Sequence, residues 1–216
     1  MSKQYQSVVQ TFFRAGIIPV IRLDQTNKAA LLAKALADGE MEAAEVTFRA
    51  QGAEKVIETM GAQCDRLMVG AGTVLTVEQA QRAKDAGARF IVSPGFNPKV
   101  VEFCLNRDIP VFPGCVTPTE IERAMEMGLT VLKFFPAEQF GGVKTIKALA
   151  GPYQQVKFMP TGGISMDNLG EYLSSPAVAA CGGTFMVKAD LLEQDRWKEV
   201  TKRCRKAMKL VKEIRR

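Results

Sequence analysis

Eight short runs of apolar and β-branched residues recur along the 216-residue chain at nearly even spacing. Their first residues lie 20 to 26 positions apart, which leaves room in each unit for one buried strand, one helix and two tight loops. Strands that alternate with helices pair in parallel, so this pattern predicts an α/β fold. The runs are residues 17–22, 43–48, 67–72, 90–94, 111–115, 131–136, 157–161 and 179–184.

The segments between these runs carry the start and stop signals of helices. Asn97 is a candidate N-cap followed by a proline. Thr117 with Glu120, and Thr76 with Gln79, have the spacing of a capping box. Glycines stand where the helices are expected to end, at Gly39, Gly61, Gly87, Gly128 and Gly151.

Eight such units match a (β/α)8 TIM barrel. An open doubly wound sheet is the structural alternative, but the even spacing shows no break where its two halves would join. Residues 3–15, before the first run, are expected to form an extra N-terminal helix that closes the bottom of the barrel. Because no linker or low-complexity segment interrupts the pattern, we expect residues 1–216 to form a single barrel domain.

The chain contains no histidine, and this excludes several classes of chemistry. An imidazole base, a Ser-His or Cys-His pair and a His-ligated zinc are all ruled out. The five cysteines are widely spaced and form no C-x-x-C pair, so neither a disulfide framework nor a zinc site is indicated. The N-terminus lacks the apolar core of a signal peptide, and no run approaches a membrane span. A cytoplasmic protein with no membrane partner is expected.

Basic residues are concentrated at the C-terminus, where residues 198–216 hold nine Lys or Arg and two Glu. Such a tail could bind nucleic acid. The alternative is a final amphipathic helix that packs its apolar side chains inward and leaves its lysines in water. No aromatic residues alternate with the charges, so the helix is favoured and no nucleic-acid partner is expected. The inward side chains would be Val200, Ala207, Leu210, Val211 and Ile214.

Two charged residues inside apolar runs are the strongest candidates for catalysis. Alternation along a strand places Glu45 opposite the face of Val46, and Lys133 opposite the face of Phe134. The apolar faces suit the helix layer, which leaves Glu45 and Lys133 pointing into the barrel. A lysine among apolar residues tends to lose its proton, and Schiff-base catalysis needs a neutral amine. A neighbouring carboxylate can shuttle protons. The structural alternatives are an ion pair between the two residues, or a lysine that extends to the rim.

Residues that follow the strands complete the candidate site, because barrels carry their active sites at the C-terminal ends of the strands. Arg49 follows the second strand and is placed to hold a substrate carboxylate. Thr73 ends a stretch of small residues that leaves room for a ligand. Gly-Gly pairs at 162–163 and 182–183 follow the seventh and eighth strands, where barrels often bind phosphate. The structural alternatives are a surface charge for Arg49, a helix cap for Thr73 and ordinary turns for the two glycine pairs.

In order along the chain, these motifs resemble those of the bacterial 2-keto-3-deoxy-6-phosphogluconate (KDPG) aldolases, which are also active as 4-hydroxy-2-oxoglutarate (KHG) aldolases. The resemblance covers almost the whole chain, from residue 16 to about residue 209. It implies a class I aldolase on a (β/α)8 barrel that needs no metal or other cofactor and forms a homotrimer. The motifs are GIIPVIR (16–22), EVTFR (45–49), VGAGTV (69–74), IVSPG (91–95), LKFFPAE (132–138) and PTGGI (160–164).

By these motifs, the resemblance implies that Lys133 is the Schiff-base lysine and Glu45 the general acid and base. Arg49 and Thr73 would hold the carboxylate of pyruvate, with Thr161 beside the bound chain. Family members commonly have serine where this chain has Thr184, so an extra methyl group lies at the phosphate contact. The residues that would hold the phosphate are Gly162, Gly163, Gly183 and Thr184.

The expected substrate is a phosphorylated keto acid, KDPG, cleaved to pyruvate and glyceraldehyde 3-phosphate. Cleavage of KHG to pyruvate and glyoxylate is expected as well. One alternative is a sister aldolase specific for the galactonate epimer, in which an apolar residue is expected in place of Thr161. A non-enzymatic barrel that binds nucleic acid is another alternative, but it leaves Glu45 and Lys133 unexplained. The absence of histidine counts against phosphosugar epimerases or isomerases that use histidine or a metal.

Overall fold

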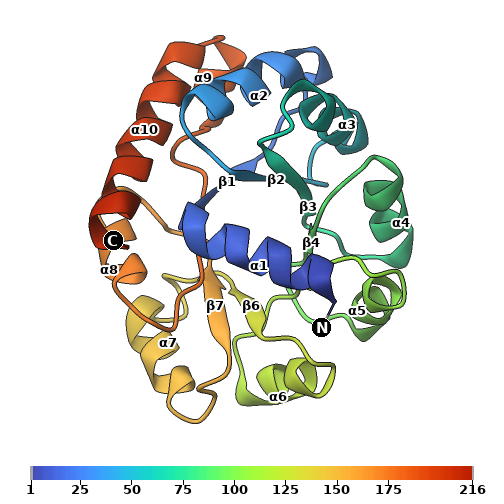
Figure 1. Ribbon diagram of the computed structural model, residues 1–216, viewed down its shortest axis with the longest axis vertical. Coiled ribbons are helices and arrows are strands. Elements are labelled where there is room, and N and C mark those ends of the chain that lie inside the picture. Colours follow the sequence, from blue (N-terminus) through green and yellow to red (C-terminus); the bar gives the residue numbers. More distant parts are fainter. Residues whose placement is uncertain (1, 216) are drawn as a thin grey trace.

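The computed structural model describes residues 2–215; Met1 and Arg216, the last of the nine basic residues, lie outside the described residues. Strands and helices alternate along the chain, which confirms the predicted α/β class (Figure 1). The strands are β1 (Ile17–Ile21), β2 (Ala43–Thr47), β3 (Met68–Gly72), β4 (Ile91–Val92), β5 (Val111–Phe112), β6 (Val131–Phe134), β7 (Lys157–Pro160) and β8 (Cys181–Gly183). The helices are α1 (Lys3–Ala15), the 3-10 turn η1 (Thr26–Lys28), α2 (Ala29–Asp38), α3 (Ala53–Gln63), α4 (Val77–Asp85), α5 (Pro98–Leu105), α6 (Pro118–Glu126), α7 (Gly142–Ala150), α8 (Leu169–Leu173), α9 (Ala189–Glu193) and α10 (Trp197–Ile214).

The strands pair in parallel and follow one another round a curled sheet, with helices along the outside (Figure 1). Six strands form one sheet in the order β5-β4-β3-β2-β1-β8, and β6 pairs with β7. Isolated parallel bridges link these two sheets on both sides. Gly114, just after β5, pairs with Lys133 of β6, and Thr161, just after β7, pairs with Gly182 of β8.

Strands β4 and β5 contain two residues each and are shorter than the predicted runs 90–94 and 111–115. Prolines explain the difference, because Pro94, Pro110 and Pro113 have no N–H to donate to a ladder. Pairing nevertheless continues beyond β5, where the Lys133 N–H donates to the Pro113 carbonyl and the Cys115 N–H to the Lys133 carbonyl, both at 2.9 Å.

Helix α1 precedes β1 and lies across the ring of strands in Figure 1. Its Phe12 ring packs on two other rings: its centroid lies 4.9 Å from that of Phe90 and 4.8 Å from that of Phe112. The Oη of Tyr5 accepts a 3.1 Å hydrogen bond from the N–H of Val131, the first residue of β6. These contacts place α1 over the N-terminal ends of the strands and leave their C-terminal ends uncovered by this helix.

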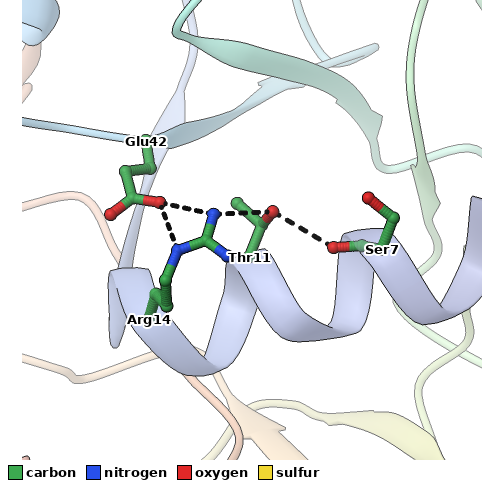
Figure 2. Close-up of polar contacts among 4 residues, drawn as sticks. All are labelled: Ser7, Thr11, Arg14 and Glu42. Carbon is green, nitrogen blue, oxygen red and sulfur yellow. Dashed lines mark hydrogen bonds and ion pairs between the residues drawn. The ribbon is translucent and has the colours of Figure 1, made fainter.

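A polar network holds the end of α1 beside β2 (Figure 2). Arg14 donates two hydrogen bonds, of 3.1 and 2.9 Å, to one carboxylate oxygen of Glu42, which immediately precedes β2. Arg14 also donates to the Thr11 hydroxyl at 3.3 Å, and that hydroxyl donates to the Ser7 carbonyl at 3.1 Å. The ion pair is exposed, so it is expected to contribute little stability.

The predicted helix signals are largely confirmed, with two differences. Thr117 and Glu120 form a complete capping box. Thr76 accepts from the Gln79 N–H at 3.2 Å, but the Gln79 side chain accepts from the preceding Leu75 N–H, so this box is only half formed. The prediction that Gly61 ends its helix is wrong, because α3 continues to Gln63 before the chain becomes extended.

The basic C-terminal segment forms the predicted amphipathic helix, α10. Val200, Ala207 and Val211 are buried, and Leu210 and Ile214 are half-buried against the core. The apolar face of this segment therefore packs against the core, as predicted. Among residues 2–215, every helix is too short or too polar to cross a membrane.

Candidate active site

Glu45 and Lys133 meet in the interior, as the alternation along their strands predicts. The Lys133 Nζ lies 3.2 Å from the Glu45 Oε1, although 88 positions separate the two residues in sequence. Their side chains are only 5% and 1% exposed. The Nζ also lies 5.5 Å from the centroid of the Phe135 ring. A primary amine and a carboxylate thus lie in direct contact, shielded from bulk water.

A cavity of about 270 Å³ opens onto this pair. It lies at the C-terminal ends of the strands, away from α1, which is the end at which (β/α)8 barrels carry their active sites. Eight of the nine residues predicted for the site line the cavity. They are Glu45, Arg49, Thr73, Lys133, Thr161, Gly162, Gly163 and Thr184.

Gly183 is the predicted residue that does not line the cavity; Gly182 and Thr184, on either side of it, do. Alternation along β8 is the reason. A Cβ atom on Gly183 would lie 2.9 Å from the Phe185 ring and 3.2 Å from Ile17, whereas one on Gly182 would meet the Thr161 side chain. The side-chain direction of Gly183 therefore faces Phe185 and Ile17 rather than the cavity.

Five further residues line the cavity, and none of them was predicted as a site residue, although Gly182 belongs to one of the two Gly-Gly pairs. Two of them could have been found by alternation, because Phe135 shares the face of Lys133, and Gly182 occupies an inward position of its strand. The others are apolar residues in apolar motifs, which carry no chemical signal of their own. The five are Val20, Pro94, Phe135, Ile164 and Gly182.

Arg49 and Thr73 lie at the rim, beyond the ends of the neighbouring strands β2 and β3. Arg49 is exposed, and within residues 2–215 no acidic side chain pairs with its guanidinium. Thr73 has a φ of 56°, which a β-branched residue rarely adopts. Such strain is commonly retained at binding sites. The rim thus offers a free guanidinium and a hydroxyl to a ligand anion.

Gly162 and Gly163 form a second part of the rim, after β7. Their φ angles of 95° and 80° lie in the region that favours glycine. The Thr184 side chain, from the loop after β8, is exposed in the same cavity. Backbone N–H groups and a hydroxyl are typical ligands of a phosphate group. Across the described part of the chain, no three His, Cys, Asp or Glu side chains gather as metal ligands.

Comparison with known proteins identifies the family. Residues 8–203 match the family model described as "KDPG and KHG aldolase". The 2-dehydro-3-deoxy-phosphogluconate aldolase of Treponema pallidum (strain Nichols) is 46% identical over 205 residues, covering 95% of this chain and 98% of the relative. The KHG/KDPG aldolase of Escherichia coli (strain K12) is 38% identical over 207 residues, covering 95% and 97%.

A solved structure agrees with these relatives. The crystal structure of KDPG aldolase from Legionella pneumophila, with pyruvate captured as a covalent carbinolamine intermediate, superposes with a TM-score of 0.88. It is 36% identical in sequence, and the match covers 91% of this chain and 96% of that one. The likeness extends over fold and sequence together, so this chain belongs to the KDPG and KHG aldolase family.

Proposed function

We propose that this protein is a class I aldolase that cleaves KDPG to pyruvate and glyceraldehyde 3-phosphate. The observation that carries the proposal is the buried contact between Lys133 Nζ and Glu45 Oε1, 3.2 Å apart at the floor of the cavity. An amine and a proton carrier in contact are what imine chemistry requires. The carbinolamine of pyruvate in the Legionella relative supports the same chemistry.

We infer that residues 1–216 form one closed (β/α)8 barrel domain with α1 as an extra N-terminal helix over its bottom. The bridges from Gly114 to Lys133 and from Thr161 to Gly182 support closure, because they link β5 to β6 and β7 to β8. The packing of Phe12 and Tyr5 on the strands supports the role of α1.

The reaction begins when the Lys133 amine attacks the C2 carbonyl of the substrate. A C–N bond forms, and the carbonyl oxygen takes up a proton to give a carbinolamine. Glu45 passes the proton released from the nitrogen to the carbonyl oxygen, and then donates a second proton, taken up from solvent, to the hydroxyl, which leaves as water. The product of this step is a protonated imine between Lys133 and the substrate.

The imine then draws electrons from the bond to be cleaved. Glu45, directly or through one water, takes the proton of the C4 hydroxyl, and the C3–C4 bond breaks. The electron pair moves to the imine nitrogen, so glyceraldehyde 3-phosphate leaves and an enamine of pyruvate remains. Protonation of C3 and attack of water on C2 release pyruvate and restore the Lys133 amine.

The rim residues orient the substrate for these steps. We assign the pyruvate carboxylate to Arg49 and Thr73, and the substrate chain to the side of Thr161. The phosphate is assigned to the loop of Gly162 and Gly163, to Thr184 and to the neighbouring Gly183. All of these residues except Gly183 line the cavity.

The substrate range is tested by comparing pyruvate release from KDPG, its galactonate epimer and KHG. We propose KDPG as the main substrate and KHG as a second one, as the name of the Escherichia coli relative supports. The expected result is the highest kcat/KM on KDPG. A higher kcat/KM on the galactonate epimer would establish the sister aldolase instead.

We further propose a homotrimer, on the strength of the family resemblance. Sedimentation equilibrium is expected to give a single species at three times the 23.6 kDa chain mass. A mass equal to that of one chain would overturn this assembly. The cytoplasmic location and the lack of a nucleic-acid partner stay predictions from the sequence.

A further inference from the structure

Glu138 has no part in the reaction above, although it ends the LKFFPAE motif that contains Lys133. It lies in the turn between β6 and α7, and its carboxylate accepts a hydrogen bond from the Oη of Tyr172 in α8. Tyr172 is 1% exposed. Burial, and then the carboxylate itself, raise the pKa of the Tyr172 phenol, so the hydroxyl keeps its proton and remains a donor.

The Glu138 side chain packs directly on the glycine loop at the cavity rim. A Cβ atom on Gly163 would lie 2.7 Å from the Cβ of Glu138. One on Gly142, at the start of α7, would lie 2.8 Å from Tyr172 Oη and 3.1 Å from Glu138 Oε1. These two glycines therefore enclose the hydrogen-bonded pair, and no larger residue fits at either position without displacing it.

The backbone adds two further links between the turn and the loop. The N–H of Glu138 donates to the Gly162 carbonyl at 3.2 Å, and the N–H of Ala137 donates to the Thr161 carbonyl at 2.8 Å. On the other side, the Asn168 side chain donates to the Gly163 carbonyl at 3.0 Å. Two consecutive glycines, which would otherwise have wide conformational freedom, are thus held between two supports.

We propose that Glu138 and Tyr172 are positioning residues that fix Gly162 and Gly163 for the substrate phosphate, and so favour phosphorylated substrates. The inference rests on the proposed function, which assigns the phosphate to this loop. An anion held by backbone N–H groups binds best when the loop is ordered before binding, because ordering it afterwards reduces the affinity. Neither Glu138 nor Tyr172 lines the cavity, so both act through Gly163.

The test compares two reactions of the same site. Cleavage of KDPG uses the phosphate loop, whereas exchange of the methyl protons of pyruvate in deuterated water uses Lys133 and Glu45 but has no phosphate. We expect Glu138→Ala and Tyr172→Phe to raise KM for KDPG roughly tenfold, in line with the loss of a hydrogen bond to a charged group. Pyruvate exchange is expected to stay at the wild-type rate. Glu138→Gln keeps an acceptor for Tyr172 and should retain a KM close to the wild-type value.

A matched control is the exposed hydrogen bond from Tyr153 to Glu122, which has the same chemistry and a length of 2.8 Å. Tyr153→Phe is expected to change neither readout. An unchanged KM for KDPG in both Glu138→Ala and Tyr172→Phe would overturn the inference. An equal fall in the rates of KDPG cleavage and of pyruvate exchange would overturn it as well. If Glu138→Ala does not fold, the result for Tyr172→Phe tests the inference alone, because that substitution removes only one oxygen atom. A wild-type protein without either reaction would refute the proposed function, whereas failure in the variants alone refutes only this inference.

Discussion

Gly72 of β3 lies directly against the carboxylate of Glu45 on the neighbouring strand β2. A Cβ atom on Gly72 would lie 2.5 Å from both the Cγ and the Cδ of Glu45, closer than real Cβ contacts allow. The space that glycine leaves is therefore the space in which Glu45 reaches Lys133. Gly72 does not have a left-handed φ, so what the site requires of it is its lack of a side chain.

Gly72→Ala is accordingly expected to keep the fold but displace the Glu45 carboxylate. Because a well-placed general acid and base contributes about 10²-fold or more, kcat on KDPG should fall roughly 100-fold with a smaller change in KM. Gly61→Ala, in α3, is the matched control, since a Cβ there would meet no atom within 4 Å. Steady-state kinetics with circular dichroism checks both variants. Wild-type kcat in Gly72→Ala would contradict this account of the contact.

Glu45→Gln is expected to separate imine formation from proton transfer. Glutamine has nearly the shape of glutamate but cannot carry the proton, so the variant should still bind pyruvate while turning over slowly. The exchange of pyruvate methyl protons, followed by NMR, is expected to fall by a factor of about 100 or more. An exchange rate equal to that of the wild type would remove Glu45 from the proton-transfer role.

Alkaline pH is expected to destabilise the protein through its buried thiols. Burial raises the pKa of four cysteines from 9.0 to about 12, so the unfolded chain loses these protons at lower pH than the native protein. The stability they provide is present below pH 9.0 and is lost as the pH rises toward 12, by at most about 1.4 kcal/mol per thiol per pH unit. The four are Cys104, Cys115, Cys181 and Cys204.

Urea unfolding at about pH 8 and about pH 10 measures this effect. The free energy of unfolding should be lower at the higher pH, and Cys115→Ala should show a shallower dependence because one thiol is removed. A free energy of unfolding that is flat or rises over this range would contradict the prediction.

The sequence was most informative where a periodic pattern determines the structure. Spacing located the strands and helices, and strand alternation placed Glu45 and Lys133 on inward faces. The same alternation, applied to β8, would have selected Gly182 rather than Gly183 for the cavity wall. Gly183 was instead assigned to the phosphate by resemblance to the family's motifs, and strand alternation was not applied to the two glycines, although both belong to β8.

Contacts between segments that are distant in the chain could not be predicted from the sequence. Alternation gives the direction of a side chain but not its distance to another strand, so the 3.2 Å approach of Lys133 to Glu45 needed the structure. The contact of Tyr172 with Glu138 joins a short helix to a turn, and neither element has a periodic signal that pairs them. Gly61 shows the same limit at short range, because glycine at an exposed position of a final helical turn need not end the helix.

All of the proposed chemistry depends on an imine between Lys133 and pyruvate. Borohydride reduction in the presence of pyruvate, followed by mass spectrometry of the intact protein and its peptides, detects this imine. We expect a single reduced pyruvate adduct on the peptide that carries Lys133, and none in Lys133→Ala, which should fold but have no turnover. The imine mechanism at Lys133 would be refuted by folded wild-type protein with no adduct, by an adduct on another lysine, or by wild-type turnover in Lys133→Ala.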